Sequence, residues 1–225
     1  MNLQFKKLNN SIIKCRSCPR LIKFRKKIIT NKRKQYKNEK YWGKPITGFG
    51  DLNGKILFVG LAPAAHGATR TGRVFTGDKS SDFLYKCLYK AKISNKDSSE
   101  HINDGLKLNN AFITTALKCV PPEDKPNKKE LINCFSFFEQ EVFLLKNLKV
   151  IIALGKIAFD ACIEFYKYNY DLKYKHKFIH GKIYQLPKNI MLVGCYHPSP
   201  RNVNTGRINQ KKMTSLFRNI KNKIN

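Results

Sequence analysis

The stretch KILFVGLAPAAHG, residues 55–67, decides the fold, because a short continuous apolar run ends in a loop of Gly, Ala and Pro. Continuous apolar runs of this length are typical of strands that are buried on both faces of a sheet. Residues 55–60 therefore predict a buried strand. Three later stretches repeat the pattern: NAFITTALK (110–118), KVIIALG (149–155) and IMLVGCY (190–196).

Helix-like segments alternate with these four strands. They span residues 80–91, 127–148, 156–168 and 205–223. An alternation of this kind favours a parallel sheet with helices on both faces. We therefore expect an α/β protein, a three-layer α/β/α sandwich around a central, mainly parallel four-stranded sheet. For 225 residues, a single domain over residues 1–225 is expected.

The charge of the chain is strongly positive. It carries 44 Lys and Arg against 15 Asp and Glu, a formal net charge of +29. The first 45 residues hold 15 of the basic residues and a single acid, Glu39, and the last 25 residues hold seven basic residues and no acid. Charge runs are often only solvated faces, but a surplus of this size favours a polyanionic partner. We expect a basic N-terminal arm over residues 1–45.

The sequence also bears on the cellular compartment. No apolar stretch of the kind found in signal peptides follows the N-terminus, and no apolar run of about 18 residues could span a membrane. The seven cysteines are an odd number, which argues against a disulfide scaffold. We expect a soluble intracellular protein without membrane contact, whose thiols are reduced and either free or bound to metal.

Four of the cysteines predict a metal site. Cys15 and Cys18 have the two-residue spacing that lets both thiolates reach one metal centre. Cys119 ends a predicted strand and Cys134 lies on the next predicted helix, so these two could complete a four-thiolate site. A redox pair or unrelated buried thiols are the alternatives, because no second C-x-x-C is present. The other cysteines have apolar neighbours and are expected in the core: Cys87, Cys162 and Cys195.

Three loops leave the carboxyl ends of predicted strands, where α/β sheets bind ligands. They are GLAPAAHGATRTGRVFTGD (60–78), CVPPEDKP (119–126) and HPSPRNVNTGR (197–207). The first is neither a P-loop nor a G-x-G-x-x-G motif, although its small residues allow a ligand to approach the backbone closely. Within it, Asp78 is either a helix N-cap or a site carboxylate, and Phe75 is either a core or a site aromatic.

The last of these loops offers a titratable group together with phosphate ligands. His197 stands at the end of a predicted strand, beside prolines that hold its backbone. Donors for phosphate oxygens are supplied by Ser199, Arg201, Asn202 and Arg207. A hydrolase built on Ser199 and His197 is a minor alternative, because the G-x-S-x-G elbow is missing.

Together these motifs resemble those of the family 5, or type-b, uracil-DNA glycosylases. The resemblance runs from about Cys15 to the C-terminus, and it is carried by CRSCPRL (15–21), YWGKPITGFGD (41–51) and the three loops. It implies a monofunctional DNA repair enzyme that hydrolyses the N-glycosidic bond of uracil, and of other deaminated or damaged bases, in single- or double-stranded DNA. It also implies a cytoplasmic, nucleoid-associated monomer.

The resemblance further implies roles for individual residues. A structural [4Fe-4S] cluster that anchors the basic arm would be held by Cys15, Cys18, Cys119 and Cys134. The leaving base would be bound by Gly60, Leu61, Ala62, Pro63, Phe75 and His197. Asp78 and Asp124 would serve the attacking water and the cationic sugar. Contacts to DNA would come from Ser199, Arg201, Asn202 and Arg207.

Two positions bear on base selectivity. Asp124 stands where the family 5 pattern has Asn, and Thr115 stands where family 4 enzymes have an Asn that reads the base edge. Two other functions are left open by the residues alone. One is a non-catalytic iron-sulfur DNA-binding module. The other is an α/β enzyme acting on free mononucleotides, which the missing phosphate-loop motif and the charge of +29 disfavour.

Overall fold

A computed structural model describes residues 3–174 and 176–224 of the chain. Its strands are β1 (Phe49–Gly50), β2 (Ile56–Gly60), β3 (Ala111–Thr115), β4 (Val150–Leu154), β5 (Ile183–Leu186) and β6 (Ile190–Cys195). Its helices are α1 (Leu3–Lys14), α2 (Pro19–Thr30), α3 (Ala68–Thr71), α4 (Lys79–Lys90), α5 (Lys128–Leu144), α6 (Lys156–Tyr170), α7 (Pro200–Asn204) and α8 (Gln210–Ile224). Short 3-10 turns are η1 (Lys34–Tyr36), η2 (Pro122–Asp124) and η3 (Pro187–Asn189).

The strands form one sheet in the order β1-β3-β2-β4-β6-β5. The four predicted strands are its parallel centre. The prediction of four strands is wrong, since the sheet has six, with antiparallel β1 and β5 at its edges. Both edges lack a continuous apolar run: β1 has two residues, and β5 exposes Gln185. The predicted helix over 205–223 also begins later, because Gly206 takes a left-handed φ of +69° between α7 and α8.

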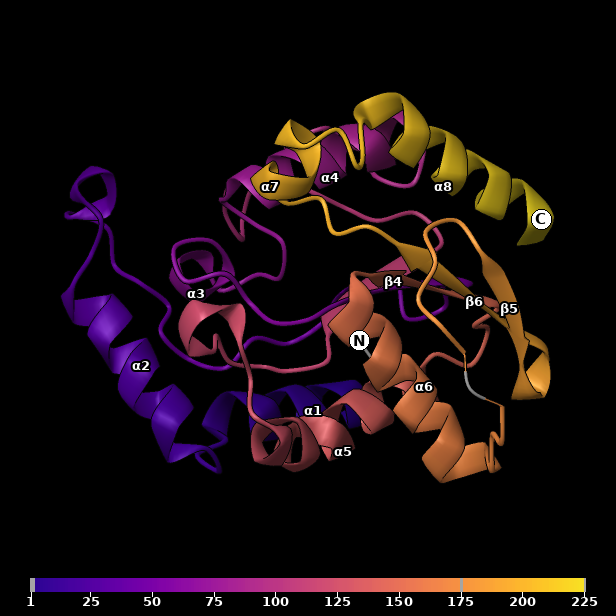
Figure 1. Ribbon diagram of the computed structural model, residues 1–225. Coiled ribbons are helices and arrows are strands. Elements are labelled where there is room, and N and C mark those ends of the chain that lie inside the picture. Colours follow the sequence, from indigo (N-terminus) through magenta and orange to yellow (C-terminus); the bar gives the residue numbers. More distant parts are fainter. Residues whose placement is uncertain (1–2, 175, 225) are drawn as a thin grey trace.

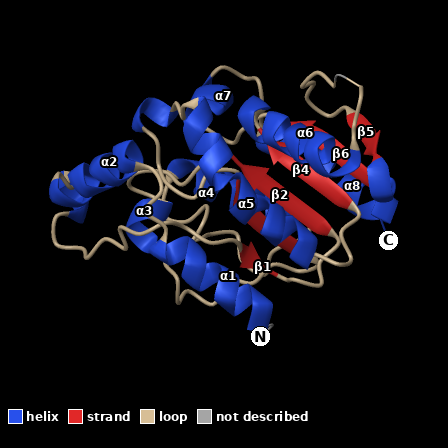
Figure 2. Cartoon of the chain, turned by 90° about the horizontal axis from the view of Figure 1, so that it is seen from below, coloured by secondary structure: helices blue, strands red, loops and turns tan. Residues whose placement is uncertain are grey.

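Helices cover both faces of the sheet, which confirms the three-layer sandwich (Figures 1 and 2). Along β2 the side chains alternate between two cores. Phe58 packs in the core under α4 and α8, where its ring meets Phe217 at 5.2 Å between centroids. Leu57 belongs to the second core, which lies under α1, α5 and α6. Each central strand is therefore covered on both sides, as its apolar run predicted.

The basic N-terminal segment folds into two amphipathic helices. The buried residues of α1 are Phe5, Leu8 and Ile12. Phe5 packs edge-on against Phe112 of β3 at 5.7 Å, and α1 lies along α5. The start of the arm is thus part of the second core. No helix in residues 3–174 and 176–224 has both the length and the apolar character needed to cross a membrane.

Candidate active site

The loops that follow β2, β3 and β6 meet around one cleft of about 390 Å³. This volume is in the range of small-molecule sites in proteins. Its walls are formed by Leu61, Ala62, Pro63, Ala64, Phe75, Asp78, Ser80, Asp124, His197, Ser199 and Pro200. Topology therefore brings together residues that lie up to 139 positions apart in the chain.

Phe75 forms an aromatic wall of the cleft in a strained conformation. Its φ of +47° is unusual for a residue with a bulky side chain. Its ring lies 5.9 Å from the His197 ring, at an interplanar angle of 32°. Gly60 does not line the cleft, but a Cβ at this position would stand 2.8 Å from the Phe75 ring. Gly60 thus makes room for the aromatic wall.

His197 is a neutral imidazole in the cleft at neutral pH. Loss of solvation on burial lowers its pKa to about 4. Within the described part of the chain, neither ring nitrogen has a hydrogen-bond partner, whereas the backbone carbonyl accepts a bond of 2.9 Å from the Asn202 side-chain amide. The loop is therefore held through its backbone, and the ring is left to bind a ligand.

The low pKa of His197 predicts a loss of stability in mild acid. An unfolded histidine titrates near 6.5 and the folded one near 4, so between these values the unfolded state binds more protons and folding becomes less favourable as the pH falls. At pH 5 this difference costs about 2 kcal/mol. Denaturant titrations at pH 7 and pH 5 should show a larger loss for the parent than for His197→Gln. An equal loss in both would mean that His197 titrates normally.

Asp78 is both a helix cap and a wall of the cleft. Its Oδ1 accepts bonds of 2.9 Å and 3.0 Å from the backbone N–H groups of Ser80 and Ser81, in a capping box that begins α4. Burial raises the pKa of Asp78, and these hydrogen bonds oppose the rise. A Cβ at position 67 would overlap Asp78 Oδ2, so any side chain larger than that of Gly67 would displace this carboxylate.

The other predicted site residues belong to β3 and to the segments that follow β3 and β6. Asp124 is exposed in η2 with a left-handed φ of +55°. Ser199 caps α7 by accepting a 3.4 Å bond from the Asn202 N–H, and the exposed Arg201 and Arg207 lie just beyond it. Thr115 is different, because it is buried at the end of β3 and does not line the cleft.

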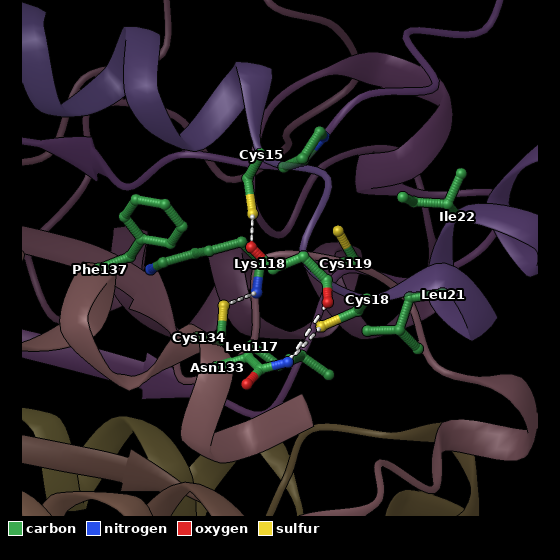
Figure 3. A pocket seen from close by; sticks show the side chains of 12 residues that line it. Cys15, Cys18, Leu21, Ile22, Leu117, Lys118, Cys119, Asn133, Cys134 and Phe137 are labelled. Atoms are coloured by element: carbon green, nitrogen blue, oxygen red, sulfur yellow. Dashed lines mark hydrogen bonds between the residues drawn. The ribbon is translucent and has the colours of Figure 1, made fainter. Parts of the chain in front are cut away.

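The four predicted metal ligands surround a separate hollow between α2, α5 and the loop after β3 (Figure 3). These cysteines are Cys15, Cys18, Cys119 and Cys134. None forms a disulfide, and the sulfurs of the last two accept hydrogen bonds, from Arg25 at 2.9 Å and from the Lys118 N–H at 3.2 Å. Burial raises the pKa of Cys119 to about 11 and that of Cys134 to about 12.

Among the described residues, no three His, Cys, Asp or Glu side chains are grouped so as to hold a single metal ion. The four sulfurs nevertheless share one hollow, whose other walls are mostly apolar. Three further cysteines lie buried in the cores, as the sequence indicated: Cys87, Cys162 and Cys195.

Sequence reasoning missed the buried network that holds the Phe75 segment. The Arg73 guanidinium donates to both Asp104 carboxylate oxygens, at 2.8 Å and 2.5 Å, and to Thr76 and Ser99 at 2.9 Å. Although burial alone would raise it, the pKa of Asp104 is held well below its usual range by Arg73 and nearby backbone amides. The network fixes the backbone between Phe75 and Asp78. The motif contains Arg73, but nothing in the sequence pairs it with Asp104.

Comparison with known proteins agrees with this geometry. The family model described as Uracil DNA glycosylase superfamily matches residues 47–221, a span that contains every wall of the cleft. A type-5 uracil-DNA glycosylase of Mycobacterium leprae is 40% identical over 95% of this chain and 93% of the relative. One from Thermus thermophilus is 41% identical over 92% of each chain. A type-4 uracil-DNA glycosylase of Pyrobaculum aerophilum is 30% identical over 73% of this chain and 66% of the relative.

The type-5 relatives match more than nine tenths of this chain, and they are more similar to it than the type-4 relative is. A match of this extent includes the parallel sheet and all three loops at its carboxyl edge. The chain therefore belongs to the uracil DNA glycosylase superfamily, in its type-5 branch.

Proposed function

We propose that this protein is a DNA repair glycosylase that hydrolyses the N-glycosidic bond of uracil in DNA, and of other deaminated or damaged bases that fit the same cleft. The observation that carries the proposal is the cleft itself, where a neutral imidazole, an aromatic ring and two carboxylates meet at the carboxyl edge of the sheet. The similarity to relatives that are named type-5 uracil-DNA glycosylases supports it.

The leaving base is assigned to one side of the cleft. Cleavage requires the nucleotide to be flipped out of the duplex, at a cost of a few kcal/mol. As the bond breaks, negative charge develops on the base, and the neutral His197 N–H donates to its carbonyl oxygen. Phe75 stacks on the ring. Leu61 and Ala62 each have a backbone N–H group that can serve as a further donor. Pro63 has no N–H and contributes only its shape.

The sugar and the attacking water are assigned to Asp78 and Asp124. Both carboxylates line the cleft, and negative charge there stabilises the cationic sugar and orients the water. Asp124 stands on the exposed 3-10 turn, while Asp78 is fixed by its capping bonds. Base selectivity is assigned to Asp124 rather than to the buried Thr115.

The variant Asp78→Asn separates the cap from the chemistry. Asn caps helices about as well as Asp, so the melting temperature should stay close to that of the parent. Because the charge is lost, the single-turnover rate of uracil release should fall by at least tenfold. Ser80→Ala, another cleft residue, serves as a control for general disturbance of the cleft. Parent-like cleavage by Asp78→Asn would reduce Asp78 to a cap and leave Asp124 as the carboxylate of the reaction.

DNA phosphates are assigned to the rim beside α7 and to the basic surface. Ser199 lines the cleft, and the exposed Arg201 on α7 and Arg207 after it offer further donors, whereas Asn202 acts by holding the His197 backbone. Most of the affinity should come from these charges and weaken with salt. A single- or double-stranded DNA substrate and a net charge of +29 also fit a monomer that works on the nucleoid in the cytoplasm.

The hollow lined by Cys15, Cys18, Cys119 and Cys134 suits a [4Fe-4S] cluster. Iron-sulfur clusters are held by four cysteine thiolates, which stand further apart around a four-iron cube than around one ion. The free thiols, the apolar walls and the hydrogen bonds that Arg25 and Lys118 donate to sulfur suit such a group. The cluster would supply structure rather than chemistry, by joining the start of α2 to the loop after β3 and to α5.

Anaerobic purification tests the cluster. The protein should be brown, with about four iron and four sulfide per chain and broad absorbance of thiolate-bound iron-sulfur centres. Cys134→Ala should lose iron and lower the melting temperature, whereas Cys162→Ala, a buried cysteine outside the hollow, should keep its iron. Stoichiometric zinc without iron or sulfide would contradict the assignment.

Release of uracil from a synthetic oligonucleotide tests the proposed activity. Duplexes with uracil, hypoxanthine, xanthine or ethenocytosine at one position define the range of bases. Cleavage separates the proposal from a non-catalytic DNA-binding module, in which the walls of the cleft would have no role. Activity on deoxyuridine monophosphate but not on DNA would instead favour an enzyme of free nucleotides.

A further inference from the structure

A second hollow of about 700 Å³ adjoins the cleft. The two share Ala64, Asp78 and Asp124, so they form one continuous depression. The far wall of the second hollow comes from residues 31–41, here called the arm loop, which follows α2 (Figure 1). The arm loop contributes Arg33, Gln35 and Tyr36 to the lining. The basic N-terminal arm therefore extends to the hollow beside the cleft.

Arg70 of α3 ties the arm loop to the cleft. Its guanidinium forms a 2.6 Å ion pair with Glu39 and lies 3.9 Å from the centre of the Tyr36 ring. The same group donates to the backbone carbonyls of His66 and Gly77, at 2.8 Å and 2.9 Å. Those two residues flank α3 and Asp78, respectively. One side chain thus joins the arm loop to two points of the loop that follows β2, one just before α3 and one just before Asp78.

Two further contacts fix the shape of the arm loop. Tyr41 Oη lies 2.8 Å from His66 Nδ1, and the Lys32 ammonium donates to the Glu39 carbonyl at 2.7 Å. The loop carries five basic residues and one acid, and that acid is already paired with Arg70. Its positive charge is therefore held in a defined place beside the cleft rather than on a loose tail.

Arg33 is the cation of the arm loop that lines the second hollow. It is exposed, and in the described residues no carboxylate or other group is bound to its side chain. Four carboxylates also line the hollow, but they stand on other walls, at the start of α4, on α4, on the loop before β3 and on η2: Asp78, Asp82, Glu100 and Asp124. Of the other cations in the lining, Arg70 is already paired with Glu39, and Lys79 begins α4 on the wall that carries Asp78 and Asp82. An anion is therefore best accommodated against the arm loop. The free guanidinium there has the geometry that suits a phosphate.

We propose that the second hollow binds the nucleotide next to the flipped one, on the same DNA strand, with its phosphate on Arg33. The proposal rests on the proposed function, since it requires a DNA strand that passes the cleft. It makes the arm loop a phosphate clamp that is positioned by Arg70. A mononucleotide would leave this clamp empty.

The phosphate clamp is tested by neutralising the phosphates of a DNA probe one at a time. The probe is a short oligonucleotide with a tetrahydrofuran abasic analogue, in which single phosphates beside the analogue are replaced by methylphosphonates. For the parent, one position on one side should weaken binding about tenfold, the size expected for one charge-assisted hydrogen bond. Arg33→Ala should bind the unmodified probe about tenfold more weakly and show no further loss at that position.

Lys34→Ala is the matched control, because it removes the same charge from the same loop but does not line the hollow. It should keep the full methylphosphonate effect, and Arg33→Lys should keep most of it. If Arg33→Ala keeps the parent's loss at every position, or if Lys34→Ala abolishes it equally, the clamp is wrong. The probe is not cleaved, so this result is independent of whether uracil is released. Conversely, the protein could release uracil while Arg33→Ala still shows the parent's methylphosphonate effect. That result would overturn the phosphate clamp and leave the proposed glycosylase activity in place.

Discussion

His197→Ala is expected to lower the single-turnover rate of uracil release about a hundredfold. A preorganised donor to developing negative charge contributes on this scale, and the His197 ring is free in the cleft. Because the imidazole is neutral, its loss removes no phosphate contact, so affinity for an uncleaved oligonucleotide should change less than twofold. Rapid-quench cleavage and fluorescence anisotropy with the same probe measure the two quantities.

The matched control is His101→Ala, which removes an exposed histidine that does not line the cleft. It should cleave uracil at the parent rate. His197→Asn should recover part of the lost rate, because an amide can also donate a neutral hydrogen bond. A parent-like rate for His197→Ala would move the stabilisation of the leaving base to the backbone of the first loop. A hundredfold loss of binding would instead show that His197 contacts DNA before the reaction.

Glu141→Leu is expected to destabilise the fold by about 3–5 kcal/mol, the cost of leaving a buried charge without its partner. The Lys118 ammonium and the Glu141 carboxylate are 1% and 0% exposed and lie 2.5 Å apart. Lys118 also donates to the Thr114 hydroxyl and the Thr115 carbonyl, both at 2.7 Å. Glu141 further accepts a 3.0 Å bond from the Gly48 N–H. The pair thus joins α5, β3 and the segment before β1.

The double variant Lys118→Met with Glu141→Leu should recover most of that loss, since no charge is then left buried. Denaturant unfolding of the parent, both single variants and the double variant gives the coupling energy. Lys156→Ala provides a surface comparison, because its ion pair with Asp160 is largely exposed and should change stability by less than about 1 kcal/mol. If the single and double variants are equally stable, the buried pair does not hold these elements together.

The central strands were predictable from sequence because their surroundings are uniform. Every residue of β2, β3 and β4 is buried, so each reads as a continuous apolar run. The edge strand β5 is only partly buried and carries Gln185, so its pattern does not differ from that of a loop. The same limit applies to β1, whose two residues are too few to show any period.

The helices of the arm were missed for another reason. In α1 the buried residues Phe5, Leu8 and Ile12 have helical spacing, and this signal was present in the sequence. The dense positive charge around these residues favours the interpretation of a solvated basic arm over that of a packed helix. In α2 the buried set includes Arg25, which donates to the Cys119 sulfur, so the helix face is not purely apolar.

Residues at strand ends were the predictable part of the site. Parallel strands share one edge, so His197 after β6 and the Phe75 loop after β2 had to approach each other. The Arg73 and Asp104 pair and the Arg70 and Glu39 pair each join residues 31 positions apart across irregular segments. Their meeting depends on loop conformation, including the left-handed φ of Phe75, and no period or motif encodes it.

The short edges of the sheet have a consequence for crowding on DNA. A long polyanion gathers many copies of a protein with a charge of +29, and neighbouring copies could then join sheet to sheet. Here β1 offers two residues at one edge, and at the other edge β5 ends after four residues at Pro187, which has no N–H. Neither edge presents a row of open backbone groups long enough to template a strand from another copy. High local concentration on DNA therefore does not lead to aggregation through the sheet.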